Sequence, residues 1–193
     1  MSRRILVING HPDPSRQRFV AALCAAYAEG ARAAGHQVRL IEVGRLALPT
    51  LRSAEDFIGG PVPPAAQGAQ ADIRWAEHLV VAHPLWLGSA PALLKGFFEQ
   101  VFRYGFAVPA PGGKAFGGLL GGRSARVVVT MGMPAAIYRL GFGAFGVRGL
   151  ERGILWLAGF SPIRRTLIGR VEADEDARKR WLQRVRDLGK RGA

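Results

Sequence analysis

Five short apolar runs, each about the length of a β-strand, alternate along the chain with segments that have helical periodicity. The runs are residues 3–9, 36–43, 79–84, 125–132 and 163–169. Strands that alternate with helices favour a parallel sheet, because each crossover helix returns the chain to the same end of the sheet and covers one face. Right-handed crossovers make such a sheet doubly wound. The sequence therefore predicts an α/β fold, a five-stranded parallel sheet with helices on both faces.

The segments between these runs carry apolar stripes with the spacing of an α-helix. One face of residues 15–35 carries Phe19, Val20, Leu23, Cys24 and Tyr27. A second stripe follows Ser89 and consists of Leu94, Phe97, Phe98, Val101 and Phe102. Such stripes are typical of helices that pack on a sheet, so we expect both to lie in the core. No repeat or domain boundary interrupts the pattern, and residues 1–193 are expected to form one domain.

The remaining segments complete the pattern. Residues 44–70 are rich in proline and glycine and predict a long surface excursion, followed by a short helix at 69–78. Residues 149–160 and 174–191 predict further helices. The glycine-rich residues 112–124 form either a mobile flap or a flexible connector, and we favour the connector.

The formal net charge of +13 raises the question of an anionic partner. Part of it lies in residues 174–191, with acids at their start and bases towards their end, an order that suits the dipole of a solvated helix. A basic surface without a recognisable reading motif is weak evidence for nucleic-acid binding. We therefore expect no nucleic-acid partner and at most a peripheral contact with a membrane.

Cysteine and histidine usage narrows the chemistry further. The single cysteine, Cys24, excludes an intramolecular disulfide and is expected to be buried, which is consistent with a cytoplasmic protein. His36, His78 and His83 do not have the spacing of metal ligands, so no metal site is predicted. No apolar run is long enough to span a bilayer.

Ligands of doubly wound sheets bind beyond the carboxyl ends of the strands. Three loops are predicted to lie there: the first loop, residues 10–18, the second loop, residues 84–89, and the third loop, residues 130–138. A site for a bound ligand is therefore expected where these three loops meet.

The first loop, "GHPDPSRQR", has the composition of an anion site. Ser15 is expected to cap a helix, with Arg16 and Arg18 in its first turn, where an anion would reverse their unfavourable interaction with the helix dipole. Backbone N–H groups, the Ser15 hydroxyl and two guanidinium groups would form a phosphate cradle. The alternative is that both arginines point into solvent. His11 either hydrogen-bonds within the loop or lies at the edge of the ligand, and the sequence leaves both open.

The second loop contains Trp86 and Leu87 between Pro84 and Gly88. Ser89 is expected to cap the helix that follows, so that helix belongs to the core while the loop lies at the ligand-bearing edge. Backbone groups of such a loop can bond the edge of a flat heterocycle while its side chains flank the ring. We therefore interpret residues 84–88 as the wall of a site for a planar ligand.

Three stretches together resemble the flavodoxin-like NAD(P)H:quinone oxidoreductases. "PLWLGSAPALLKGFFEQVF" is similar to that family's proline-aromatic loop and following helix. "VVVTMGMPAAIY" is similar to its next flavin loop, in which a Thr-x-Gly turn is followed six residues later by tyrosine. "HPDPSRQRF" resembles its phosphate loop more loosely. The stretches occur in family order, and the resemblance extends over nearly the whole chain.

The resemblance implies a flavodoxin-like fold and a bound flavin, FMN or FAD, of which we favour FMN because nothing in the sequence identifies an adenine pocket. It implies that NAD(P)H reduces the flavin and leaves, and that a quinone or similar acceptor then takes two electrons at the same face. It also implies a homodimer whose sites lie at the subunit interface. The sequence does not decide between NADPH and NADH or among acceptors.

The resemblance also implies a role for individual residues. The phosphate would be held by His11, Ser15, Arg16, Gln17 and Arg18. The ring would be lined by Pro84, Leu85, Trp86, Leu87 and Gly88. Its other edge would contact Thr130, Met131, Gly132 and Met133. Tyr138 would lie over the reacting face as a catalytic residue and donate a hydrogen bond to the acceptor or to reduced flavin.

One position departs from the family pattern. Some members have a histidine six residues after the tyrosine, where this chain has Ala144. A tyrosine–histidine pair is therefore not available for proton delivery, so either Tyr138 acts alone or water supplies the proton.

A second hypothesis for the function is that the protein is an ancillary subunit, because some relatives of the family dock on potassium-efflux membrane proteins.

Overall fold

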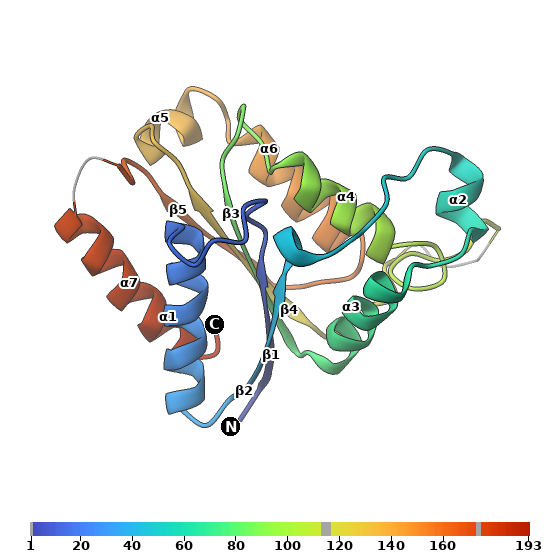
Figure 1. The fold of residues 1–193 in the computed structure, drawn as a ribbon, viewed down its shortest axis with the longest axis horizontal. Coiled ribbons are helices and arrows are strands. Elements are labelled where there is room, and N and C mark those ends of the chain that lie inside the picture. The colour runs from blue at the N-terminus through green and yellow to red at the C-terminus, as the bar shows by residue number, and fades with distance from the viewer. Residues whose placement is uncertain (1, 113–116, 173–174) are drawn as a thin grey trace.

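The structure is a computed structural model that describes residues 2–112, 117–172 and 175–193. Its five strands form one parallel sheet in the order β2-β1-β3-β4-β5 (Figure 1). The strands are β1 (Arg4–Asn9), β2 (Gln37–Glu42), β3 (His78–Pro84), β4 (Ser124–Thr130) and β5 (Ile163–Ile168). The predicted five-stranded parallel sheet is confirmed, and each strand begins and ends within two residues of its predicted bounds.

Helices cover both faces of this sheet, as predicted. One face carries α1 (Phe19–Ala33) and α7 (Glu175–Lys190), whose residues pack with Ile5, Val7 and Val80 of the strands. The other carries α3 (Pro64–Trp75), α4 (Ala92–Val101) and η2 (Gly149–Trp156), a helix with π-type hydrogen bonding. Successive strand residues point to opposite faces, so alternate residues of each central strand enter opposite cores.

The stripes predicted on α1 and α4 lie in the core. Val20, Leu23, Cys24 and Tyr27 of α1 are buried, and Phe19 packs against their cluster. The α4 stripe, with Phe102 just beyond the helix, is buried throughout. Burial raises the pKa of the Cys24 thiol to about 12, because the thiolate would lose its hydration, so this side chain is apolar filler.

Two segments contain more helix than the sequence predicted. The expected surface excursion holds the 3₁₀ turn η1 (Val43–Arg45), the helix α2 (Ala54–Gly59) and the start of α3. Ser53 caps α2, since its hydroxyl accepts a hydrogen bond from the Asp56 N–H at 3.0 Å, and proline at the first position favours an earlier start of α3. The third loop and the residues after it contain α5 (Ala135–Leu140) and α6 (Phe145–Arg148).

Residues 113–116 of the glycine-rich connection lie outside the described residues, so the choice between flap and connector remains open. Across the described ranges, none of the helices combines the length and apolar character that crossing a membrane requires.

Helices α1 and α7 lie side by side (Figure 1), and two glycines let them approach closely. A Cβ on Gly30 of α1 would lie 2.0 Å from the Arg186 carbonyl oxygen of α7. A Cβ on Gly189 of α7 would lie 2.1 Å from the Tyr27 carbonyl oxygen of α1. Each contact is with backbone, which cannot rotate away, so a side chain at either glycine would separate the helices.

We predict that Gly30→Ala lowers the free energy of unfolding by about 1–3 kcal/mol, because the added methyl group overpacks the helix contact. The matched control is Gly68→Ala at an exposed position of α3, where a Cβ meets no atom within 4 Å. That substitution should leave stability unchanged or raise it by up to about 1 kcal/mol, since alanine favours helix over glycine. Urea unfolding of both variants measures the difference, and equal effects would contradict the close packing.

Candidate functional site

The three loops contact one another at the carboxyl edge of the sheet. The N–H of Leu85, which follows β3, donates to the carbonyl oxygen of Thr130 at 2.7 Å and joins the second loop to the third. The rings of His11 and Trp86 lie nearly perpendicular, with centroids 5.9 Å apart, and join the first loop to the second. The expected convergence of the three loops is therefore present.

A tight turn forms the exposed part of the second loop. Trp86 and Ser89 exchange two backbone hydrogen bonds of 2.9 and 3.0 Å across Leu87 and Gly88, whose φ angles are +47° and +78°. Positive φ at both central residues is the geometry of a type I′ turn. Leu87 is fully exposed and Trp86 half exposed, whereas Pro84 is buried. The exposed wall is thus shorter than predicted and consists of Trp86, Leu87 and Gly88.

Ser89 does not cap the next helix, contrary to prediction. Helix α4 begins at Ala92, with Pro91 as its N-cap residue, three positions after the turn. The backbone of Ser89 is bonded across the turn to Trp86, so it cannot also initiate the helix. The turn and α4 are therefore separate elements.

The first loop also differs from the prediction. Helix α1 begins at Phe19 with Arg18 as its N-cap residue, so Ser15 is not the cap and neither Arg16 nor Arg18 lies in the first helical turn. The Ser15 hydroxyl instead accepts a hydrogen bond from the Gln17 N–H at 3.3 Å. Short polar side chains often close turns in this way, in competition with a helix start.

Asp13, which the sequence analysis did not single out, uses two of the donors that were expected to bind phosphate. Its carboxylate accepts from the Ser15 N–H at 2.8 Å and from the Arg18 guanidinium at 2.7 Å. These two contacts hold the pKa of the Asp13 carboxyl below its usual value. A carboxylate thus occupies the donors of the loop, which shows that their chemistry fits an anionic group. The acid and the base in "DPSR" could have signalled that Asp13 competes with a phosphate for these donors.

His11 is used within the first loop. Its Nδ1 accepts a hydrogen bond from the Asp13 N–H at 3.0 Å, while its ring edge packs against Trp86. The sequence left two roles open for His11, a hydrogen bond within the loop and a place at the edge of the ligand. The hydrogen bond within the loop is present in the structure. The contact with Trp86 also places the ring beside the wall of the second loop.

The third loop contributes little exposed side chain. Thr130 and Met131 are buried, and Met133 is 37% exposed. A Cβ built on Gly132 meets no described atom within 4 Å, so the backbone faces open space there. Gly88 on the second loop is open in the same way. The two glycines leave room for a ring at which a larger residue would intrude.

Tyr138, which the resemblance assigns to the reacting face, contacts the turn of the second loop. It sits on α5, is 1% exposed, and donates its hydroxyl proton to the Gly88 carbonyl oxygen at 2.8 Å. The Tyr138 hydroxyl oxygen in turn accepts a hydrogen bond from the Val147 N–H at 3.4 Å. Burial raises the pKa of the Tyr138 phenol. A buried tyrosine hydroxyl is normally paired, and this one is paired inside the protein.

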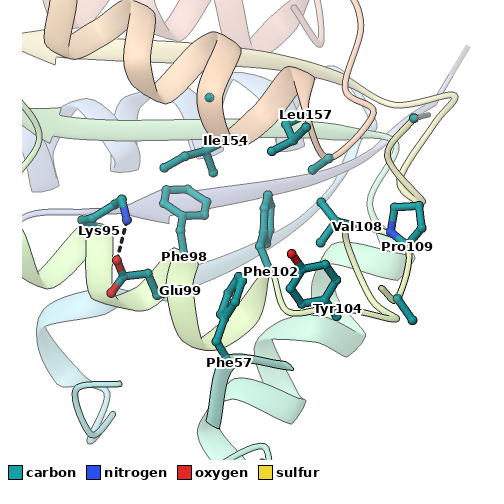
Figure 2. A pocket seen from close by; sticks show the side chains of 14 residues that line it. Phe57, Lys95, Phe98, Glu99, Phe102, Tyr104, Val108, Pro109, Ile154 and Leu157 are labelled. Atoms are coloured by element: carbon teal, nitrogen blue, oxygen red, sulfur yellow. Dashed lines mark hydrogen bonds and ion pairs between the residues drawn. The ribbon is translucent and has the colours of Figure 1, made fainter. Parts of the chain in front are cut away.

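A cavity of about 540 Å³ lies along α4 instead of at the three loops (Figure 2). Phe98 of α4 and Phe102, just beyond it, face Ile154 of η2 and Leu157, just beyond η2, with Phe57 of α2 on another side. Its walls are mainly apolar, with the Lys95–Glu99 ion pair at one side. Among the residues that the structure describes, no group of His, Cys, Asp or Glu could hold a metal ion.

Comparisons with known proteins agree with the fold. The flavodoxin-like fold family matches residues 3–189 of the chain. The chain is 28% identical over 194 residues to the ribosyldihydronicotinamide dehydrogenase-like protein traD of Penicillium crustosum, covering 83% of this chain and 70% of that protein. The structure of the NAD(P)H:quinone oxidoreductase from Methanothermobacter marburgensis matches with a TM-score of 0.81 at 25% identity, over 98% of this chain and 96% of that one.

A shorter match points to another kind of relative. Over 70 residues the chain is 43% identical to the glutathione-regulated potassium-efflux system ancillary protein KefG of Escherichia coli, which covers 36% of each protein. The match to the fold family extends over almost the whole chain, so the protein belongs to the flavodoxin-like fold family. The predicted family and the prediction of an oxidoreductase are confirmed.

His83 lies directly before the second loop and is buried at the end of β3. Its Nδ1 is 2.8 Å from the Pro84 carbonyl oxygen, so the neutral ring donates from Nδ1, while Nε2 has no partner among the described residues. Burial lowers the pKa of His83 to about 4 from its ordinary value of 6.5. The folded protein therefore holds this ring neutral at a pH where the unfolded chain protonates it.

We predict that stability falls as the pH is lowered from about 6.5 to about 4, because unfolding then takes up a proton at His83. Near pH 5 this histidine contributes roughly 1 kcal/mol per pH unit to the slope. Urea unfolding of wild type and His83→Met across this range isolates the effect, since all other groups titrate in both. Equal slopes for the two proteins would contradict the buried neutral ring.

Proposed function

We propose that the protein is a flavin-dependent oxidoreductase that passes two electrons from NAD(P)H through a bound flavin to a quinone or similar acceptor. The observation that carries the proposal is the contact of the three loops, which joins anion-binding donors in the first loop to an exposed turn and two open glycines. The relatives and the solved structure named as dehydrogenase and quinone oxidoreductase support it.

The chain offers distinct groups for each part of a flavin. The phosphate is assigned to His11 and residues 15–18, where Asp13 now occupies the donors. The ring is assigned to residues 84–88 on one side and to residues 130–133 on the other. A bound flavin supplies the two-electron chemistry, whereas the protein orients the partners and excludes water. We propose FMN over FAD, since no adenine pocket is recognisable in the part of the chain described.

We further propose that the protein acts as a homodimer. Four apolar side chains on and near α5 and α6 are 53–75% exposed: Ile137, Leu140, Phe142 and Phe145. Leu157, which lines the cavity along α4, is 51% exposed, and the neighbouring Trp156 is 64% exposed. Exposed apolar residues gathered near a site mark an interaction surface. A second copy would cover them and complete the site.

The lone buried thiol and the absence of any possible intramolecular disulfide support a cytoplasmic location.

A second candidate is an ancillary subunit that keeps the fold and docks on a membrane transporter. The local identity to the potassium-efflux ancillary protein and the net charge of +13, which suits an acidic partner, favour it. Flavin binding without turnover, together with co-purification of a transporter, would support this candidate over the enzyme.

The proposed function is tested by titrating the protein with FMN and with riboflavin, which has the same ring but no phosphate. We predict that wild type binds both, and that Arg18→Gln weakens FMN binding roughly tenfold, the equivalent of one charge-assisted hydrogen bond of about 1.5 kcal/mol. Riboflavin affinity should not change, because Arg18 would contact only the phosphate. Flavin fluorescence measures both dissociation constants.

Arg32→Gln is the matched control, because Arg32 is an exposed arginine in the last turn of α1, the helix that Arg18 caps. It should leave both affinities unchanged. If wild type took up neither flavin, the proposed function would be wrong. If Arg18→Gln weakened both flavins equally, the phosphate would not lie at the first loop.

For the dimer, we predict that Phe145→Glu produces monomers, because a carboxylate in an apolar interface loses its hydration without a partner. Sedimentation velocity measures the change. Leu40→Glu is the control, since Leu40 is 47% exposed on the edge strand β2, away from α5 and α6. A wild-type monomer, or a dimer that tolerates Phe145→Glu, would contradict the proposed interface.

A further inference from the structure

The turn of the second loop holds a conformation that its own residues do not favour. Leu87 has φ of +47°, in the left-handed region where a Cβ clashes with the following carbonyl oxygen. Its side chain is fully exposed, so packing of that side chain does not hold the turn. Residues in such conformations persist where the surrounding structure fixes them, and they cluster at functional sites.

Two contacts from outside the loop fix this turn. The Tyr138 hydroxyl donates to the Gly88 carbonyl oxygen at 2.8 Å. Gly146 of α6 lies directly against the turn, since a Cβ at that glycine would be 2.1 Å from the same oxygen and 2.6 Å from the Ser89 Cα. The shape of the turn therefore depends on α5 and α6.

Tyr138 is itself held firmly. Its ring is 1% exposed, and its carbonyl oxygen accepts from the Ala144 N–H at 3.1 Å. The hydroxyl oxygen accepts from the Val147 N–H at 3.4 Å while its proton goes to Gly88. The one proton that the phenol can donate is thus already used inside the protein.

We propose, on the basis of the proposed function, that Tyr138 is a positioning residue that holds the Leu87–Gly88 turn in the shape that receives the flavin ring. It does not deliver a proton to the acceptor, the role that family resemblance would give it. Fixing the turn before binding removes an ordering cost from the binding step, so the Tyr138 hydroxyl contributes to flavin affinity.

The test is Tyr138→Phe, which keeps the buried ring and removes only the hydroxyl. We expect the dissociation constant for FMN to rise roughly two- to tenfold, the range for loss of one neutral hydrogen bond. The visible spectrum of bound flavin should shift as the turn relaxes. The pH profile of NAD(P)H oxidation should keep its shape, because the Tyr138 phenol does not supply a proton to the reaction.

Tyr27→Phe is the matched control for a general loss of stability. Tyr27 is a fully buried tyrosine on α1 whose hydroxyl bonds the Ala193 carbonyl oxygen at 3.4 Å. Loss of the Tyr27 hydroxyl should lower thermal stability, as the loss of a buried hydrogen bond does, and FMN affinity should stay at the wild-type value.

A second pair of variants tests the turn without changing Tyr138. Gly146→Ala must displace the turn, because its Cβ would overlap backbone atoms of Gly88 and Ser89, and we expect it to weaken FMN binding more than Tyr138→Phe does. Gly149→Ala is the control, since a Cβ there meets no atom within 4 Å, and it should bind FMN like wild type.

The outcomes separate this inference from the proposed function. If wild type binds no flavin, the proposed function fails and the inference fails with it. If wild type binds FMN but Tyr138→Phe binds it equally well and loses an alkaline limb of the pH profile, Tyr138 is a proton donor and the inference alone is wrong. Unchanged FMN affinity in Gly146→Ala would also overturn it.

Discussion

Burial of the central strands on both faces, in parallel register, is the constraint on which the site depends. Because β1, β3 and β4 run in the same direction, their carboxyl ends meet at one edge of the sheet. The register pairs Pro84 with Thr130, so the second and third loops leave the sheet side by side. The apolar strands therefore determine where loops far apart in sequence come together.

Small and polar residues of the loops determine what can bind at this edge of the sheet. Gly88 and Gly132 leave open space beside the turn, whereas Gly146 allows α6 to support it from behind. The Asp13 carboxylate neutralises the donors of the first loop in the absence of another anion, so a phosphate must compete with an internal ligand. The affinity for a phosphate-bearing ligand therefore depends on how much more strongly the phosphate binds these donors than the Asp13 carboxylate does.

The sheet was predictable because its signal is local. Residues 79–84 are apolar throughout, as a strand buried on both faces must be, and the helix stripes repeat at a fixed spacing. The Ser15 cap was predicted wrongly because a turn closed by Asp13 competes with the helix start within the same few residues. The Tyr138–Gly88 hydrogen bond joins residues 50 apart, and no sequence spacing signals such a contact.

The central claim is that the three loops form one preformed cradle for a flavin. A crystal structure of the protein soaked with FMN tests it most directly. The account predicts the ring beside the Leu87–Gly88 turn and Gly132, the phosphate at the first loop in place of the Asp13 carboxylate, and the Tyr138–Gly88 hydrogen bond intact. A ring bound elsewhere, or a phosphate remote from the first loop, would contradict it.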